Sequence, residues 1–161
     1  LDIPVLPVCS LASQAQSVPL SVGTRILSVM DAQIGQVYWA WFEMTTTGLN
    51  SLSAPLVSSP TDVIGPSGES LQQLGSNIAI LGDGTDLVCS AHSEFSAAEF
   101  VSEARPRPSN TALAFLDQID QSLLLQASQL EPRYVQKDIG WKKLSEQGKK
   151  GNGTTEQGKG I

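Results

Sequence analysis

The sequence is poor in the residue types on which most catalytic and metal sites depend. Its 161 residues include one histidine, His92, and two cysteines, Cys9 and Cys89, which form no C-x-x-C pair. Because a zinc site needs clustered Cys and His ligands, no metal site is expected. We expect two reduced, mostly buried thiols in a cytoplasmic protein. A redox-sensing Cys9–Cys89 disulfide is the alternative.

Positive charge is scarce as well. There are 10 Lys and Arg against 16 Asp and Glu, which gives a net charge of -6. A broad basic face for nucleic acid is therefore not expected, and Lys142–Lys143 and Lys149–Lys150 are interpreted as part of a solubilising tail. No apolar run approaches the ~20 residues that span a bilayer, so no membrane contact is expected.

What is present is the composition of a globular domain, with 40% hydrophobic and 16% charged residues. The length suits one domain or slightly more. The chain begins with Leu1 and not Met, and a strand-like segment, residues 3–8, follows almost at once. This start predicts a piece of a longer protein.

A β-hairpin is the clearest local signal. Residues 25–30 (RILSVM) have the character of a buried strand, and residues 37–42 (VYWAWF) are rich in β-branched and aromatic residues. Residues 31–35 are predicted to form the turn, with Gly35 at positive φ. A third strand is predicted over residues 52–57.

The aromatic residues of the hairpin have two interpretations. Exposed, they could stack on bases. Alternation, however, places Trp39 and Trp41 on one face and Tyr38 and Phe42 on the other. Since no Lys or Arg is interleaved, burial between a sheet and helices is favoured.

The remaining segments alternate between helix and strand. Helices are predicted over residues 11–16, 63–74 with a break at Gly65–Pro66, 97–101, and from Ser109 or Asn110 to residue 123, with a strand at 77–81. This order predicts an α/β fold, a mixed sheet covered by helices on the ribonuclease-H-like plan. The predicted organisation is a strand and helix at 1–20, the main lobe at 21–130, a packing segment at 131–144 and a disordered tail at 145–161.

Asp31 is the first candidate for chemistry, because it ends a buried strand and is followed by a turn containing Gly35. A carboxylate can hold a metal-bound water, and glycine lets backbone amides approach a phosphate. A lone Asp in a turn is more often structural, and that interpretation is favoured.

Gly82–Asp83–Gly84 is the second candidate, as a strand end that could contact a nucleotide. It lacks the third glycine and the downstream acid of a dinucleotide fingerprint, so a tight turn is favoured.

Two nucleophile hypotheses have little support. Cys89 and His92 could act as nucleophile and base, but such partners usually come from separate elements. Ser10, Ser90 and Ser93 have no G-x-S-x-G context. From the residues alone no catalytic constellation emerges, and a nucleotide-binding half-domain, a degenerate one kept for partner binding and a generic α/β domain all remain open.

Four stretches resemble the TsaB/YeaZ family. The most specific is residues 30–40 (MDAQIGQVYWA), which resemble its "(I/M)DAR-x-(G/N)-(E/Q)-VY-x-A" stretch. Residues 3–15 resemble "lP-v-x-v-S-S-L-x-x-x-A", residues 81–84 resemble "v-G-x-G", and residues 131–143 resemble "P-x-Y-L-R … A-x-x-K". The resemblance covers residues 1 to about 144.

The resemblance implies one half of an actin-like (ASKHA) fold and a non-catalytic role. Family members are partners of the catalytic subunit TsaD and the ATPase TsaE, which add threonylcarbamoyl to adenosine 37 of tRNA. The family is related to a group labelled glycoproteases, so a glycoprotease-like peptidase or a nucleotide-binding hydrolase is the alternative function. Asp31, Gly35, Gly82, Asp83 and Gly84 would be degenerate nucleotide-site positions, with no cofactor except ATP at the interface of the complex.

The chain departs from the family pattern at several places. Gln33 replaces the usual Arg of "DAR", and Val135–Gln136 replaces "L-R". The first lobe, with its "GPGSFTGLR" stretch, is absent, so homodimerisation through that lobe would need residues outside this chain. Contact with tRNA would be indirect.

Overall fold

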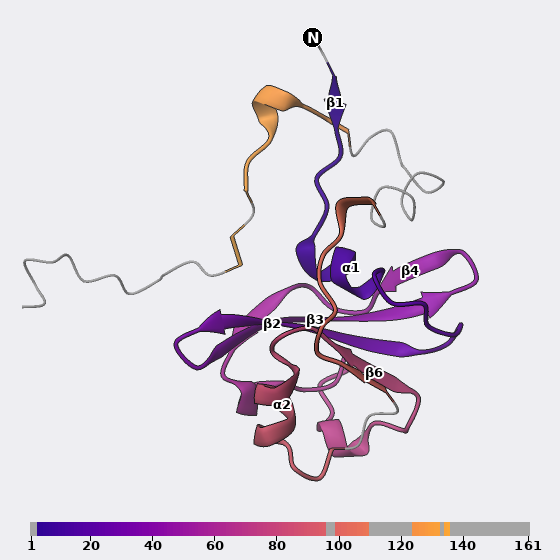
Figure 1. Ribbon diagram of the computed structural model, residues 1–161, viewed down its shortest axis with the longest axis vertical. Helices are drawn as coiled ribbons and strands as arrows, with labels where there is room; N and C mark the ends of the chain where they lie inside the picture. The colour runs from indigo at the N-terminus through magenta and orange to yellow at the C-terminus, as the bar shows by residue number, and fades with distance from the viewer. Residues whose placement is uncertain (1–2, 96–98, 110–123, 133, 136–161) are drawn as a thin grey trace, which may run out of the picture.

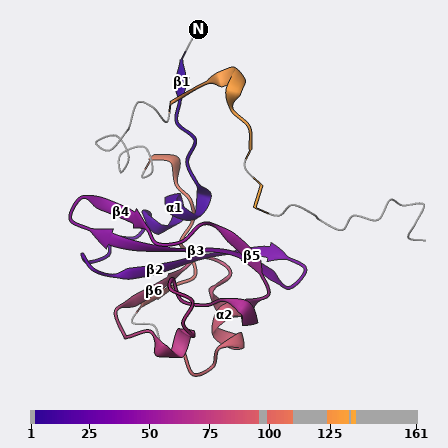
Figure 2. The same ribbon diagram turned by 180° about the vertical axis from the view of Figure 1, so that it is seen from behind.

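A computed structural model describes residues 3–95, 99–109, 124–132 and 134–135. The fold is a mixed β-sheet with a short helix on each face, and a two-stranded ribbon stands apart from it (Figures 1 and 2). In sheet order, the strands of the main sheet are β4 (Gly48–Ser51), β3 (Gln36–Thr45), β2 (Arg25–Gln33), β6 (Ile78–Leu81) and β7 (Glu99–Val101), and β5 (Leu56–Ser58) pairs with β3.

The hairpin of β2 and β3 is confirmed and is longer than the sequence predicts. The two strands pair antiparallel from Arg25 opposite Glu43 to Gln33 opposite Gln36. The strands extend into the predicted turn because Asp31 still pairs with Val37, with a register shift before Gln33. Only two residues connect the strands.

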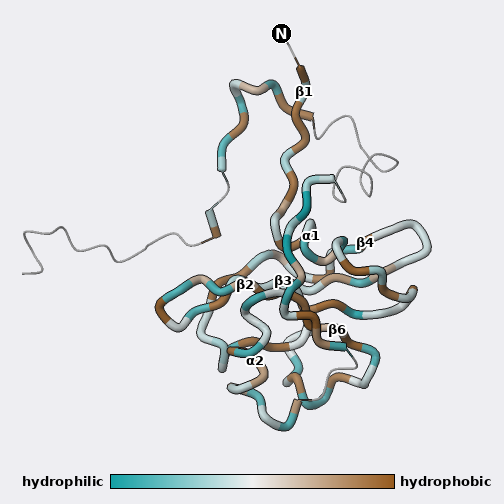
Figure 3. The backbone as a smooth tube through the Cα atoms, viewed as in Figure 1, coloured by the Kyte–Doolittle hydropathy of each residue, from teal (hydrophilic) through white to brown (hydrophobic). Residues whose placement is uncertain are grey.

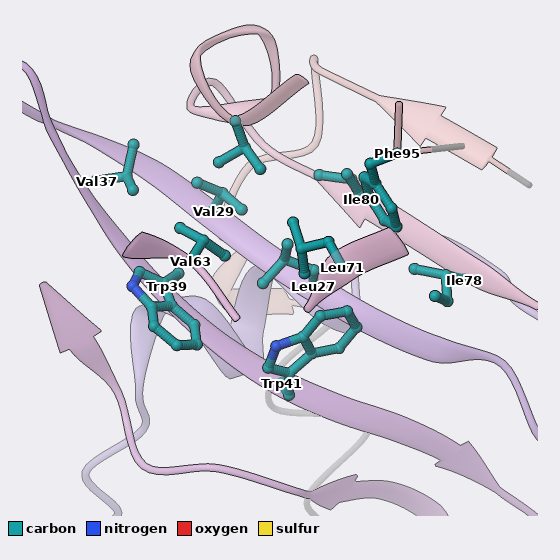
Figure 4. Packing of buried hydrophobic residues seen from close by; sticks show 11 residues of the cluster. Leu27, Val29, Val37, Trp39, Trp41, Val63, Leu71, Ile78, Ile80 and Phe95 are labelled. Carbon is teal, nitrogen blue, oxygen red and sulfur yellow. The ribbon is translucent and has the colours of Figure 1, made fainter. Parts of the chain in front are cut away.

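Successive side chains of β3 point to opposite faces of the sheet, as the sequence predicts. Trp39 and Trp41 are buried on one face with Val37, while Ala40 and Phe42 are buried on the other. Figure 4 shows both indoles packed among Leu27, Leu71 and other apolar side chains of the first face. The expected burial is therefore confirmed.

The prediction of a single third strand over residues 52–57 is wrong. Two short strands replace it: β4 pairs antiparallel with the far end of β3, and β5 pairs with β3 near the hairpin turn. Pro55 lies between them. Because proline lacks the amide hydrogen that a continuous ladder requires, one strand is divided into two.

The helix predicted over residues 63–74 is also wrong. Single 3₁₀ turns occur instead at Pro60–Asp62 (η1) and Leu71–Gln73 (η2). The segment between them is irregular, and the Ile64 carbonyl accepts a hydrogen bond from Trp41 Nε1 at 2.7 Å. Buried Val63 and Leu71 anchor the segment to the core, so tertiary contacts override the helical pattern.

The strand β6 is confirmed, and it pairs parallel with both β2 and β7. The helix α2 (Thr85–Ala91) follows within a region that the sequence left ambiguous. Residues 99–101 of the helix predicted at 97–101 form β7 instead, and residues 97–98 lie outside the described part.

Two apolar clusters, one on each face, hold the sheet in place. The face toward α2 carries the larger cluster, with Leu27, Ile80 and Val88 fully buried. The face toward α1 (Ser10–Ala15) carries Ile26, Leu81 and the helix's own apolar residues. Figure 3 shows this apolar concentration along the strands of the sheet, with more polar residues in the loops.

The ribbon pairs β1 (Pro4–Val5) with β8 (Leu125–Gln126), and the 3₁₀ turn η4 (Ala127–Gln129) follows it. The helix predicted from Ser109 or Asn110 to residue 123 lies almost wholly outside the described residues. So do the tail at 145–161 and most of the segment at 131–144. No helix in the described residues has the length and hydrophobicity that a bilayer crossing needs.

Candidate functional site

The carboxyl ends of β2 and β6 form the candidate site, because they bring two predicted segments together. The strands are parallel, with Ser28 opposite Leu81. Asp31 therefore follows at the same end of the sheet as Gly82–Asp83–Gly84. Ends of parallel strands are common places for ligands in α/β folds.

A chain of hydrogen bonds joins these segments. The backbone amide of Asp31 donates to Asp83 Oδ1 at 2.9 Å, and the amide of Gln33 donates to Asp31 Oδ1 at 2.7 Å. The Asp31 carboxylate thus holds the turn that follows it, as Asp commonly does, and the Asp83 carboxylate ties the β6–α2 loop to β2. This contact supports the structural interpretation of Asp31 that the sequence favoured.

Beyond Asp31 the hairpin turns through three consecutive residues with positive φ: Gln33 at 65°, Ile34 at 55° and Gly35 at 73°. Positive φ at Ile34 and Gly35 is what a two-residue type I′ connection requires. A Cβ on Gly35 would meet no atom within 4 Å. Gly35 therefore serves the turn conformation rather than a close approach to another group.

Gly82 and Gly84 serve close internal packing. Gly82 has φ of 110°, and a Cβ there would overlap the Val29 carbonyl and the Gln14 amide. A Cβ on Gly84 would press on Val29 and the backbone near Asp31. Both glycines thus let the β6–α2 loop lie directly against β2, and their small size is used within the protein.

Gln14 is an important site residue that the sequence did not reveal. It is fully buried, and its Nε2 donates to Ser28 Oγ at 2.9 Å, the Val29 carbonyl at 3.1 Å and the Leu81 carbonyl at 2.9 Å. The Ser28 hydroxyl in turn donates to the Leu11 carbonyl at 2.9 Å. One amide therefore joins α1 to the middle of β2 and to the carboxyl end of β6.

A weak signal for Gln14 was present in the sequence. It lies among Leu11, Ala12 and Ala15 in a short helix whose other buried side chains are small or apolar. A polar residue on such a face normally has hydrogen-bond partners. Among the described atoms, Gln14 Oε1 is buried with no partner.

His92 does not reach Asp31 and Asp83. It caps the carboxyl end of α2, whereas the two aspartates lie at the amino end, about 10 Å away for seven helical residues. His92 Nε2 lies 2.9 Å from the Pro60 carbonyl, which can only accept a hydrogen bond. His92 is therefore held as a donor at this nitrogen.

The two thiols do not form the Cys9–Cys89 disulfide, and the environment of Cys89 does not suit a nucleophile. Cys9 is exposed beside α1, Cys89 packs on the opposite face of the sheet, and both are free. Burial, with a smaller contribution from the Asp86 charge, raises the pKa of Cys89 above its ordinary value. A raised pKa disfavours the thiolate that a nucleophile needs. The expectation that both would be mostly buried is wrong for Cys9.

The aromatic strand does not form a base-stacking surface. Trp39 and Trp41 are 3% and 0% exposed. The Trp39 indole donates to Ser58 Oγ at 3.0 Å and the Trp41 indole to the Ile64 carbonyl. Both rings are therefore part of the hydrophobic core.

The charge of the described residues is strongly negative, with ten Asp and Glu against three Arg. Within these residues no three His, Cys, Asp or Glu side chains gather closely enough to hold a metal. The arrangement at the ends of β2 and β6 is therefore two carboxylates that accept backbone amides, one within the hairpin and one between the β6–α2 loop and β2.

Comparison with known proteins places this fold in a class. The chain has the mixed α/β fold of YeaZ-like proteins. A crystal structure described as an uncharacterized protein with similarity to peptidase YEAZ from Pseudomonas aeruginosa matches with a TM-score of 0.67 and 19% identity. The match covers 83% of this chain and 59% of that one.

YeaZ from Pseudomonas aeruginosa matches with a TM-score of 0.65 and 19% identity, over 81% of this chain and 58% of that one. This chain thus spans less than two thirds of either structure. No protein-family model and no curated protein matches the sequence.

Proposed function

We propose that this protein is a TsaB-type scaffold subunit of the complex that adds threonylcarbamoyl to adenosine 37 of tRNA. Its partners in this proposal are TsaD-type and TsaE-type proteins in the cytoplasm. The observation that carries the proposal is the match in fold to YeaZ over 81% of the chain, and to the structure described as similar to YEAZ over 83%. The motif at residues 30–40, on which the sequence resemblance rests, forms the β2–β3 hairpin of that shared fold.

The proposal includes one half of an actin-like fold. Strands β2, β3 and β4 form an antiparallel meander, and β6 and β7 follow on the other side of β2, parallel to it. This order supports the ribonuclease-H-like plan.

The geometry of the site favours a scaffold over an enzyme. A hydrolase needs an acid, a base and a nucleophile that converge on one point. Here Asp31 and Asp83 hold backbone amides, and His92 lies at the far end of α2. In this proposal no cofactor binds the lobe itself, and ATP is placed only at the interface of the complex.

The acidic character of the described residues supports indirect contact with tRNA. An acidic surface repels the phosphate backbone, so the tRNA would be held by another subunit. In this proposal the protein contributes by assembling with that subunit.

Reconstitution tests the proposal. TsaD-type and TsaE-type subunits, tRNA and the small-molecule substrates are combined with or without this protein, and mass spectrometry of digested tRNA measures the modified adenosine. We expect modification to depend on this protein, and calorimetry to show binding to at least one subunit. Absence of both binding and stimulation would reject the scaffold function.

The alternative, a peptidase or nucleotide hydrolase, is tested with the protein alone. Nucleotide titration and peptide cleavage assays are run on the wild type and on Asp31→Asn. Cleavage or hydrolysis that is lost in Asp31→Asn would favour the enzyme and contradict the scaffold proposal.

A further inference from the structure

The tip of the β2–β3 hairpin (residues 33–36) carries a highly exposed apolar side chain, that of Ile34. Ile34 is 89% exposed, the largest value among the exposed large hydrophobic residues. Figure 1 shows the hairpin extending beyond the body of the sheet. A scattered exposed apolar residue is ordinary, so exposure alone does not imply a role.

The backbone at Ile34 makes the residue unusual. Its φ of 55° lies in the left-handed region, where a β-branched side chain is a genuine outlier. Asn or Gly suits this turn position far better. Ile34 therefore has no packing role in the described chain and is locally unfavourable. Such conflicts concentrate at functional sites.

Two hydrogen bonds anchor the backbone that leads into the tip. Asp83 binds the Asp31 amide and Asp31 binds the Gln33 amide, so both ends of the register shift are fixed. The two-residue turn then presents Ile34 from an ordered hairpin. A preorganised apolar side chain loses little entropy when it enters a pocket.

Charge around the tip indicates the chemistry of its partner. Asp31 lies just before the tip, Asp83 is hydrogen-bonded to its amide and Asp86 lies in the first turn of α2, and all three are exposed. Nucleic acid is disfavoured by this charge, and a second copy of the chain would bring like charges together. The complementary surface is a protein pocket with an apolar floor and a rim of Lys or Arg.

We propose that the hairpin tip is a docking knob, with Ile34 as its anchor, for such a pocket on one subunit of the proposed complex. The inference rests on the proposed function, because the partner is sought among the TsaD-type and TsaE-type subunits. Ile34 would supply the apolar contact, and the aspartates would supply orientation and a salt-sensitive attraction.

The test compares two variants by calorimetric titration against each purified subunit. Ile34→Asn removes the anchor and fits the left-handed backbone. Val22→Asn is the matched control, because Val22 is 60% exposed and precedes the opposite end of β2. We expect Ile34→Asn to weaken binding about 30-fold, as loss of an interface hot spot does, and Val22→Asn to leave it unchanged. Raising the salt concentration should weaken wild-type binding.

Unfolding in urea separates loss of binding from loss of folding. Ile34→Asn is expected to unfold at the same or a higher urea concentration than the wild type, because Asn relieves the strained turn. If the wild type and Ile34→Asn bind a subunit equally well, the docking knob is rejected while the scaffold function stands. If the wild type binds neither subunit, the proposed function fails and the knob with it.

Discussion

Gln14 shows how much of this fold depends on one polar side chain. A buried amide donates to the Val29 and Leu81 carbonyls and to Ser28, at the point where the pairing of β2 with β6 ends. A buried backbone carbonyl without a partner is costly. The side chain therefore continues the link between β2 and β6 beyond their last pair, Ser28 and Leu81.

Replacing Gln14 with leucine is expected to destabilise the protein by about 3 kcal/mol, because a similar volume is kept while the three acceptors around Nε2 lose the two N–H groups that they share. Urea unfolding followed by tryptophan fluorescence measures the change. Gln72→Leu is the control, since Gln72 is exposed in η2 and should change stability by less than about 0.5 kcal/mol. Equal effects of the two substitutions would contradict this role of Gln14.

The two thiols should differ in reactivity. Cys9 is exposed, whereas burial raises the pKa of Cys89. We expect iodoacetamide to modify Cys9 first at neutral pH. In Cys9→Ser, the rate of Cys89 alkylation should rise only above the ordinary thiol pKa, because the thiolate is the nucleophile. Equal rates for both thiols at neutral pH would contradict this expectation.

The same shift has a consequence for stability. A raised pKa in the folded state means that the folded protein holds the proton more tightly than the unfolded chain. Its contribution to stability is complete below the unfolded pKa and is lost as the pH rises through the folded value. Comparing Cys89→Ala with the wild type across alkaline pH measures this loss, which should be absent in the variant.

At the scale of elements, the loop from β6 to α2 packs against β2 so closely that there is no room for a side chain at Gly82 or Gly84. Gly82 adopts φ of 110°, and the Thr85 hydroxyl donates to its carbonyl at 2.6 Å. The tight turn predicted for Gly82–Asp83–Gly84 is thus part of the contact between two strands and a helix.

Gly82→Ala should lower stability by about 3 kcal/mol or prevent folding, because the new methyl group overlaps the Val29 carbonyl and the backbone disfavours it. Gly75→Ala is the control, since a Cβ there meets nothing within 4 Å and its φ is not positive. It should be neutral or stabilising by about 0.5 kcal/mol. Thermal unfolding measures both, and a neutral Gly82→Ala would refute the packing argument.

Elements differed in how well the sequence predicted them. The apolar run in residues 25–30 and the β-branched and aromatic content of residues 37–42 made the hairpin predictable. Residues 63–74 have a helical pattern but are broken by Gly65–Pro66, and contact with Trp41 decides their course. At the site, the roles of Asp31 and Gly35 in the turn were predictable, whereas the bond from Asp31 to Asp83 was not.

At the scale of the whole molecule, stability should be unevenly distributed. The β2–β3 ladder spans the sheet between two apolar clusters, whereas β1 and β8 pair over only two residues and stand apart from the sheet (Figures 1 and 2). A two-stranded ribbon by itself is marginal in water.

Hydrogen exchange followed by NMR tests this distribution. Amides in the middle of β2 and β3, such as those of Val29 and Trp39, should exchange at the rate of global unfolding, and those of Val5 and Leu125 should exchange much faster. Protection of the ribbon equal to that of Val29 would mean that the ribbon and the sheet unfold as one unit.

The sequence by itself determined the hairpin and the faces of its side chains, because a strand's period of two is a local property of the backbone. It also determined the turn at Gly35, where positive φ is required. Only the tertiary structure decided that Asp83 meets Asp31 and that Gln14 joins the middle of β2 to the end of β6. Those contacts arise from parallel pairing and helix docking between residues far apart in the chain, and no local pattern encodes them.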